Sequence, residues 1–533
     1  MTATIHIFVL LLAVLAAVAV LARRLDTAPS ILLVIAGIVL ALIPGLPRIQ
    51  LAPEFVLLVL LPPIIYTAGV SMSWREFRFN LRPIALLAFG CVVFTTCAVA
   101  GAIHWLLGWP WAVSVVLGAI VAPPDVVAPL ALARPLNVPR RLLVVLEGEG
   151  LANDATALIL YRFAVAAIVT GTFSALEATG TFALIVVGEI VYGIGIAWLG
   201  LRLRRWAADP RVEIVLSLIT PYAAYWVPQY LGGSGVLATI AAGLYVSWHG
   251  PLLIGSPTRL QGIFFWDLII YIIEGFVFLL TGLQARTLLE SADTASWREL
   301  VATTALTAIV LIIARFVWVF PATYLPRWLI PAVARRDPSP PWQWPFMLAF
   351  TGVRGVVSLA AALGIPLTLA SGAPFPHRDL ILVITFGVII VTLVGLGSML
   401  PAVIRWLGIA RGGAEERLRE RESELSARFE TLEVAQKRLD EMASERTLPE
   451  EVTALISNYH DNIRRQFAKT LSEGIERAAL NDDLRLELIE AERQHLHRML
   501  REGRITDESR RRIERELDLE EAALVSRGAS ARP

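Results

Sequence analysis

The stretch LLVVLEGEGLANDATALILYRFAVAAIV, residues 142–169, decides how the rest of the chain is interpreted. It is long enough to cross a bilayer core of roughly 30 Å as a helix, which takes about 20 apolar residues. Yet it carries three carboxylates and an asparagine, Glu147, Glu149, Asn153 and Asp154. Because an ionisable side chain in a membrane span costs about 3 kcal/mol or more, this density indicates a functional site.

The whole chain has the composition of a membrane protein. Of its 533 residues 56% are hydrophobic and 17% are charged, whereas soluble chains carry about 25% charged residues. This excludes a soluble enzyme, and the net charge of +1 gives no reason to expect a nucleic-acid partner. We predict an all-α polytopic membrane protein. Its apolar runs predict about thirteen transmembrane helices, near residues 4–22, 28–46, 53–72, 83–107, 110–132, 142–169, 179–201, 212–231, 234–248, 262–284, 300–325, 343–369 and 379–408.

Arginines gather in alternate loops between these runs. Since cytoplasmic loops carry the positive excess, an odd number of spans predicts an N-terminus outside and a C-terminus in the cytoplasm. We therefore expect a transmembrane domain over residues 1–408 and a helical cytoplasmic tail over 409–533. In the tail, Leu418, Leu425, Leu432 and Leu439 recur every seven residues, which predicts a coiled-coil seam; a second helical stretch is expected over about 482–524, with core positions Leu484, Leu488, Leu496 and Leu500.

A second polar interruption lies in AIVAPPDVVAPLALA, residues 119–133. Pro123 and Pro124 stand directly before Asp125, and proline removes amide donors and leaves carbonyl oxygens free. Irregular backbone inside a membrane survives only where it is buried in protein or lines an aqueous cavity, and broken helices are typical of transporter ion sites. We expect Asp125 and Asp154 to bind a small cation, with Pro124 beside the pathway. The alternative is a simple kink in which Asp125 caps the second half-helix.

The run FTGVRGVVSLAAALGIP, residues 350–366, contains Arg354 between Gly352 and Gly355. Small residues let neighbouring helices approach, and a guanidinium can bind a carboxylate with two hydrogen bonds. We predict a structural ion pair between Arg354 and Glu149.

Glu147 shares a helical face with Asp154 and lies about 10 Å from it, towards the basic end of the span. It is a candidate entry relay for protons or cations; the equally weighted alternative is an ion pair with an inner-loop arginine such as Arg140 or Arg141. Gly150, one turn from Asp154, is expected to leave space for a small hydrated ion.

Other polar residues of the spans are weaker candidates. Glu274 is a candidate pathway residue, but either it or Glu189 could be a paired packing residue. Arg162 is expected to neutralise a carboxylate or to extend to the outer interface.

These features resemble the monovalent cation:proton antiporters of the NhaP and sodium/proton exchanger type, over about residues 5–408. The resemblance implies a homodimer of thirteen-helix protomers with a six-helix core built from inverted repeats, in which the fifth and twelfth spans are unwound, crossing helices. The matching segments are LPPIIYTAG at 61–69, APPD at 122–125, EGEGLANDATAL at 147–158, SGVLATIAAGLY at 234–245 and RGVVSLAAALGIP at 354–366.

The resemblance also implies roles for individual residues. Asp154 looks like the carboxylate that carries the cation or the proton, Asn153 its neutral neighbour and Asp125 the acid of the broken helix. Glu149 and Arg354 look like the structural ion pair. The chain departs from the family pattern at Gly150, where serine is usual, and at Pro124, where threonine is usual, which leaves Na+ over K+ selectivity open.

The expected function is therefore exchange of Na+, or else Li+ or K+, for H+ across the plasma membrane, electroneutral because residue 153 is not a second acid. It would regulate intracellular pH and cation content, with no cofactor and with membrane lipid as the surroundings. K+/H+ antiport is the main alternative. The sequence has neither the filter-like loop of a cation channel nor the GxGD signature of an intramembrane aspartyl protease.

Overall fold

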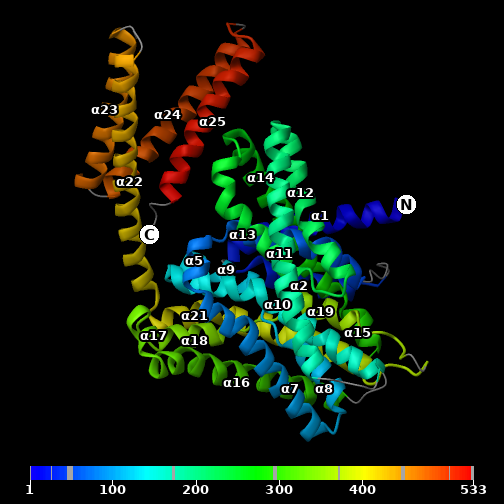
Figure 1. Cartoon of the computed structure of the whole chain (residues 1–533). Helices are drawn as coiled ribbons and strands as arrows, with labels where there is room; N and C mark the ends of the chain where they lie inside the picture. The colour runs from blue at the N-terminus through cyan, green and yellow to red at the C-terminus, as the bar shows by residue number, and fades with distance from the viewer. Residues whose placement is uncertain are drawn as a thin grey trace. The chain divides into compact units, whose positions relative to one another are not determined.

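The computed structural model consists of helices joined by loops, with one isolated antiparallel bridge between Thr368 and Pro374 among the residues it describes. The chain divides into two compact units, Met1–Ala410 and Arg411–Pro533 (Figure 1). The described residues are 2–25, 27–44, 52–170, 175–291, 297–369, 372–445, 450–473, 475–502 and 504–529.

In the first unit, nine helical segments of the described chain are long and apolar enough to cross a membrane. Six of these consist mainly of one α-helix: α1 (Thr2–Leu25), α10 (Arg140–Thr170), α11 (Ala175–Ala207), α13 (Val236–Leu253), α14 (Ser256–Leu283) and α16 (Trp297–Leu329). Three contain a π-helical turn: α3 (Pro53–Phe55), η1 (Val56–Leu60) and α4 (Leu61–Ser71); α6 (Leu81–Ala85), η2 (Leu86–Cys91) and α7 (Val92–Leu107); α20 (Arg378–Ile390), η5 (Val391–Leu396) and α21 (Gly397–Leu407). The remaining helices are α2 (Pro29–Ala41), α5 (Trp74–Phe79), α8 (Trp111–Val121), α9 (Val127–Ala133), η3 (Arg134–Leu136), α12 (Pro210–Tyr230), α15 (Ala285–Ser291), α17 (Pro331–Arg336), α18 (Gln343–Phe350) and α19 (Val356–Leu363).

Local sequence explains where several of these helices begin and end. Before α12, the Asp209 carboxylate accepts hydrogen bonds from the amides of Arg211 and Val212, at 2.9 and 3.2 Å, and Pro210 occupies the first helical position. At the end of α7, Gly108 adopts a left-handed conformation with φ of 71°, which a residue with a side chain rarely does.

Two pairs of short helices in the first unit, Met1–Ala410, are each separated by a few residues of irregular backbone. Residues 122–126 separate α8 from α9, and residues 351–355 separate α18 from α19. Pro123 and Pro124 lack the amide protons that a continuing helix would need. The two irregular segments meet, because the Asp125 amide donates to the Val353 carbonyl at 2.7 Å.

Three arginines near the ends of predicted spans, which the structure places in α6, α10 and α16, meet at one carboxylate. Arg82, Arg141 and Arg327 place guanidinium nitrogens 2.5, 2.8 and 2.7 Å from the oxygens of Asp337. Three of the regions that carry the predicted positive excess therefore lie together at Asp337.

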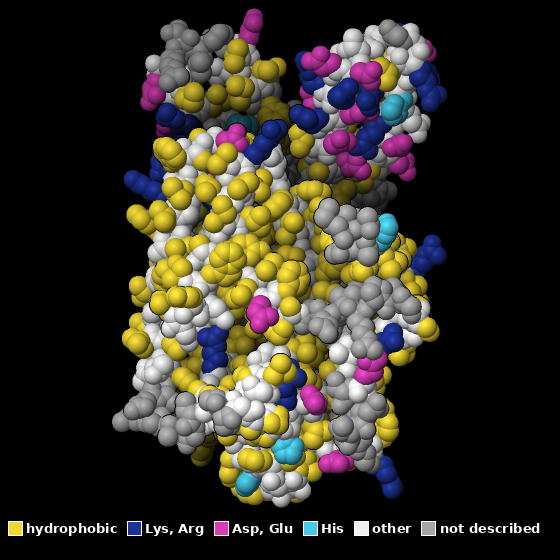
Figure 2. Space-filling view, turned by 90° about the vertical axis from the view of Figure 1, so that its right-hand side faces the viewer, with side chains coloured by type: hydrophobic (Ala, Val, Ile, Leu, Met, Phe, Trp, Pro, Cys, Tyr) yellow, Lys and Arg dark blue, Asp and Glu magenta, His cyan; other side chains and the backbone are white. Residues whose placement is uncertain are grey.

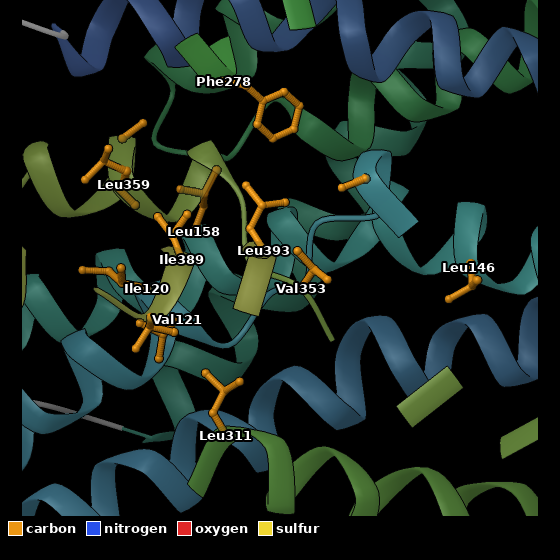
Figure 3. Packing of buried hydrophobic residues seen from close by; sticks show 14 of the residues in the cluster. Ile120, Val121, Leu146, Leu158, Phe278, Leu311, Val353, Leu359, Ile389 and Leu393 are labelled. Atoms are coloured by element: carbon orange, nitrogen blue, oxygen red, sulfur yellow. The ribbon is translucent and has the colours of Figure 1, made fainter. Parts of the chain in front are cut away.

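Apolar side chains fill the interior and also cover much of the outside of the first unit. Figure 3 shows part of the interior, with Val121 from α8, Leu158 from α10 and Leu393 from η5 in one buried cluster. Figure 2 shows hydrophobic side chains over most of the visible surface of the unit, with few charges among them. An apolar exterior is expected where lipid, not water, is the solvent.

The second unit contains α22 (Ala410–Glu445), α23 (Glu450–Glu473), α24 (Ile475–Arg501) and α25 (Asp507–Ala529). The helical stretch predicted over about 482–524 consists of two helices, α24 and α25, packed through Ile489, Leu496, Leu517 and Leu524. The predicted core positions Leu484 and Leu488 are exposed. The pairing is reinforced by Arg485, which binds both carboxylate oxygens of Glu520 at 2.6 and 2.9 Å.

Candidate functional site

The break between α8 and α9 is held by Asn153 of α10. Its fully buried side-chain amide donates to the Pro124 carbonyl at 2.7 Å. The carbonyl freed by the proline pair is thus satisfied by a neutral donor, which explains why an asparagine stands at the centre of an apolar span. The next residue, Asp154, is placed beside the break by the same helix.

Arg354 holds the two breaks together. Its side chain donates to the carbonyls of Val121 at 2.9 Å and Ala122 at 3.1 Å, at the end of α8, and to Gly352 in its own irregular segment. Its backbone amide donates to the Thr392 hydroxyl at 3.0 Å. A guanidinium is suited to this position, because the C-terminal carbonyls of a helix carry partial negative charge.

Asp125 lies where α9 and α19 both begin. Its carboxylate accepts a long, 3.4 Å hydrogen bond from the Val127 amide, while Oδ2 is buried with no hydrogen-bond partner in the described structure. A Cβ added to Gly355 would lie 2.6 Å from the Asp125 Cβ, so glycine is required for this approach. An unsatisfied carboxylate oxygen between two helix N-termini is suited to accept a proton or to bind a cation.

Asp154 is partly buried, and its carboxylate is close enough to that of Asp125 for the two negative charges to repel. Its backbone amide donates a 2.7 Å hydrogen bond to the Asn153 side-chain oxygen. The structure therefore brings Asp125, Asn153 and Asp154 together at the break. Glu274 of α14 interacts electrostatically with Asp125 and is also half-buried.

The predicted ion pair between Glu149 and Arg354 is wrong. Glu149 is fully buried and binds Arg315 of α16 through two hydrogen bonds, of 2.5 and 2.8 Å. Arg315 also donates to the Leu348 carbonyl at 3.1 Å. The structural pair therefore joins α10 to α16, and Gly352 leaves the room through which the Arg315 side chain passes.

The space predicted beside Gly150 is filled. A Cβ at this position would collide with the Val126 side chain in the α8–α9 break. Gly150 therefore serves close packing between α10 and the break and does not leave room for a hydrated ion. A serine there would require Val126 to move.

The chain is similar to known proteins over most of its length. Residues 9–406 match the family described as sodium/hydrogen exchanger, transmembrane. The chain belongs to the sodium/hydrogen exchanger family. An uncharacterised Na+/H+ exchanger of Mycobacterium tuberculosis is 34% identical over 97% of this chain and 96% of its own length. A sodium, potassium, lithium and rubidium/H+ antiporter of Bacillus subtilis is 30% identical over 89% of this chain and 71% of its own.

Among solved structures, this exchanger resembles the sodium proton antiporter MjNhaP1 of Methanocaldococcus jannaschii. The TM-score is 0.59 at 19% identity, over 76% of this chain and 98% of that one. This similarity supports a shared fold. The expected family resemblance is confirmed, and the chain is a multi-pass membrane antiporter of cations and protons.

Two further carboxylates of the exchanger have structural partners. Glu189 of α11 is buried and accepts hydrogen bonds from the amides of Ser234, Gly235 and Leu237 at the start of α13. Arg162 of α10 donates to the Gly233 carbonyl in the same loop. Glu189 is thus a capping residue that joins α11 to α13.

Glu147 is paired as well, but not with Arg140 or Arg141. Its carboxylate lies 2.8 Å from the guanidinium of Arg134, which is largely exposed. Arg140 instead binds Glu76, at 2.6 Å. The geometry favours the ion-pair interpretation of Glu147 over the relay.

We expect Glu147→Gln to leave exchange nearly unchanged. An exposed ion pair contributes about 0–1 kcal/mol, so both the stability and the pH profile of transport should stay close to those of the wild type. The measurement is cation-driven proton flux in proteoliposomes across a range of pH. A shifted pH profile would instead support a role for Glu147 as an entry relay.

Proposed function

We propose that this exchanger is a secondary active Na+/H+ antiporter in which Asp154 binds either a proton or a cation. The observation that supports it is the unsatisfied Asp125 oxygen beside Asp154 at the junction of two broken helices. Two repelling carboxylates in a site with few hydrogen-bond donors are stabilised by a proton or by a cation. Competition for one carboxylate couples the two fluxes when the site is exposed alternately to each side.

The ligands of the cation follow from which oxygens remain available. The carbonyls of Val121, Ala122 and Pro124, which the break frees from α8, already accept hydrogen bonds from Arg354 and Asn153. We therefore assign the cation to the carboxylates of Asp125 and Asp154, completed by water. Glu274 is assigned to the approach.

The proposed architecture has thirteen spans in each protomer of a homodimer. The nine long segments of the described chain would be joined by four more spans, namely α2, α12 and the interrupted pairs α8–α9 and α18–α19. The two interrupted pairs would be the crossing helices of inverted repeats. The protein would lie in the plasma membrane, with Arg82, Arg141 and Arg327 on its cytoplasmic side. The helical second unit would be a cytoplasmic regulatory tail.

Proteoliposome exchange with single cations tests the proposal. The protein is reconstituted with an internal pH dye, and a preset pH gradient is challenged with Na+, Li+, K+ or choline. We expect Na+ and Li+ to dissipate the gradient and choline to leave it. A response to K+ alone would establish the alternative, K+/H+ antiport, which the name of the Bacillus subtilis relative makes the second candidate.

We also expect exchange to be electroneutral. The site has one carrier carboxylate beside a neutral Asn153, so one proton should replace one monovalent cation. The rate of Na+-driven flux should then be unchanged when the membrane potential is clamped with valinomycin at 0 or at −100 mV, settings whose difference is worth about 2.3 kcal/mol per charge moved. A rate that follows the potential would show that net charge moves. Unitary currents of channel size would overturn the carrier itself.

A further inference from the structure

A cavity lies away from the Asp154 site, between the ends of α4, α11, α12, α13 and α14. Its volume is about 330 Å³, within the range of about 300–1,000 Å³ that is usual for small-molecule sites. Most of its wall is apolar, with residues such as Val246 and Ile254. None of the residues proposed to carry transport lines it.

The cavity wall contains a buried arginine to which the described residues supply no acidic partner. Arg204 of α11 is 6% exposed, its Nε has no hydrogen-bond partner in the described structure, and one terminal nitrogen lies 3.4 Å from the Tyr66 hydroxyl. The C-terminal end of α11 compensates part of the charge. A buried guanidinium that lacks a carboxylate is nevertheless costly, which points to an anion that the protein does not itself supply.

A buried acid lines the same cavity and does not meet this arginine. Glu213, in the first turn of α12, is 8% exposed, and the described structure shows no ion pair between Glu213 and Arg204. Aromatic rings lie close by: Tyr66 and Trp266 pack with centroids 5.7 Å apart, and the Trp266 indole donates to the Ser217 hydroxyl at 3.0 Å. The cavity therefore offers one buried cation, one buried anion and aromatic faces.

The surroundings indicate an occupant that comes from the membrane. Ile263 of α14 lines the cavity and is 63% exposed on the apolar outside of the unit, so the cavity is open towards the region of lipid chains. The other two charged residues of the wall, Arg259 and Asp267, are exposed. Arg259 is already bound to the carbonyls of Pro251 and Ile254 at the end of α13.

We propose that this cavity binds the headgroup of an aminophospholipid. The phosphate would bind the guanidinium of Arg204, which is suited to two parallel hydrogen bonds. The ammonium would bind Glu213, with the Trp266 face available for a cation–π contact. The acyl chains would leave past Ile263 into the bilayer. The inference concerns a lipid site and does not depend on the proposed transport mechanism.

The test measures lipid binding to the full-length, delipidated protein in detergent, by native mass spectrometry and by thermal unfolding. Phosphatidylethanolamine should bind and raise the unfolding temperature, phosphatidylglycerol should bind at least about tenfold more weakly, and inorganic phosphate or free phosphoethanolamine should not substitute. Arg204→Gln should abolish binding of both lipids at this site, because both carry the phosphate that Arg204 would bind. Arg205→Gln removes the same charge from an exposed position of the same helix and should retain that binding.

Glu213→Gln separates the two halves of the proposal. It should bring phosphatidylethanolamine down to the affinity of phosphatidylglycerol while leaving the latter unchanged. If Arg204→Gln does not fold, Glu213→Gln and the comparison of the two lipids on the wild type still test the proposed site. Equal binding of both lipids by the wild type, equal loss in Arg204→Gln and Arg205→Gln, or full substitution by free phosphate would each overturn the site, whatever the transport assays give.

Discussion

Replacing Asp154 by asparagine is expected to abolish cation-driven proton flux. The amide cannot hold a proton and a cation in turn, so the competition that couples the two fluxes disappears. The variant should still fold, because the Asp154 carboxylate forms no hydrogen bond or ion pair with the described residues, and an amide fits the same space. We expect flux within the background of empty liposomes, a loss of at least about a hundredfold, equivalent to about 2.7 kcal/mol or more in the rate barrier.

The measurement is the decay of a pH gradient in proteoliposomes after Na+ is added. Glu147→Gln is the matched control, since it makes the same carboxylate-to-amide change on the same helix α10, at a carboxylate paired with Arg134. Size-exclusion profiles and unfolding temperatures of the two variants establish that both are folded. Exchange by Asp154→Asn above a tenth of the wild-type rate would show that another group carries the proton.

The rule that ionisable residues inside a span are functional or paired drew attention to one short stretch of α10. It singled out Asn153 and Asp154, and proline chemistry singled out the break before Asp125. Both predictions rest on local properties, namely hydrophobic length, helix periodicity and the missing amide of proline. The structure brings these three residues together.

The partner of each polar group was harder to predict, because partners come from helices distant in sequence. Arg315 lies alone in the apolar run 300–325, and the same rule that selected the acids could have selected it. Arg354 was assigned to Glu149 because both lie in polar interruptions. The sequence does not show that α16 lies close to α10. This approach brings Arg315 to Glu149, and Arg354 instead donates hydrogen bonds to the carbonyls at the end of α8.

The space around the site was likewise beyond sequence reasoning. A glycine at position 150 indicates either an opening or a close contact, and periodicity cannot distinguish the two. Val126 fills the position because the α8–α9 break folds against α10. The free carbonyls of the break were predicted, but not that Asn153 and Arg354 would donate hydrogen bonds to them.

The largest stability effect is expected at the buried pair of Glu149 and Arg315. Replacing Arg315 by methionine leaves a fully buried carboxylate without its two hydrogen bonds and should destabilise the protein by about 3–5 kcal/mol. Replacing Glu149 by leucine should cost a similar amount, because it leaves the guanidinium unpaired. The double replacement removes both charges and should recover much of the loss, since a buried pair and an apolar pair of similar volume are often close in stability.

A double-mutant cycle distinguishes this pairing from the one that the sequence suggested. Glu149→Leu with Arg315→Met should be strongly non-additive, with a coupling of about 2–3 kcal/mol, whereas Glu149→Leu with Arg354→Met should be closer to additive. Arg354→Met should itself destabilise, since the carbonyls of Val121 and Ala122 lose their donor. Unfolding in detergent, followed by tryptophan fluorescence, measures all five variants. Stronger coupling of Glu149 to Arg354 than to Arg315 would show that the pair forms differently in the membrane protein.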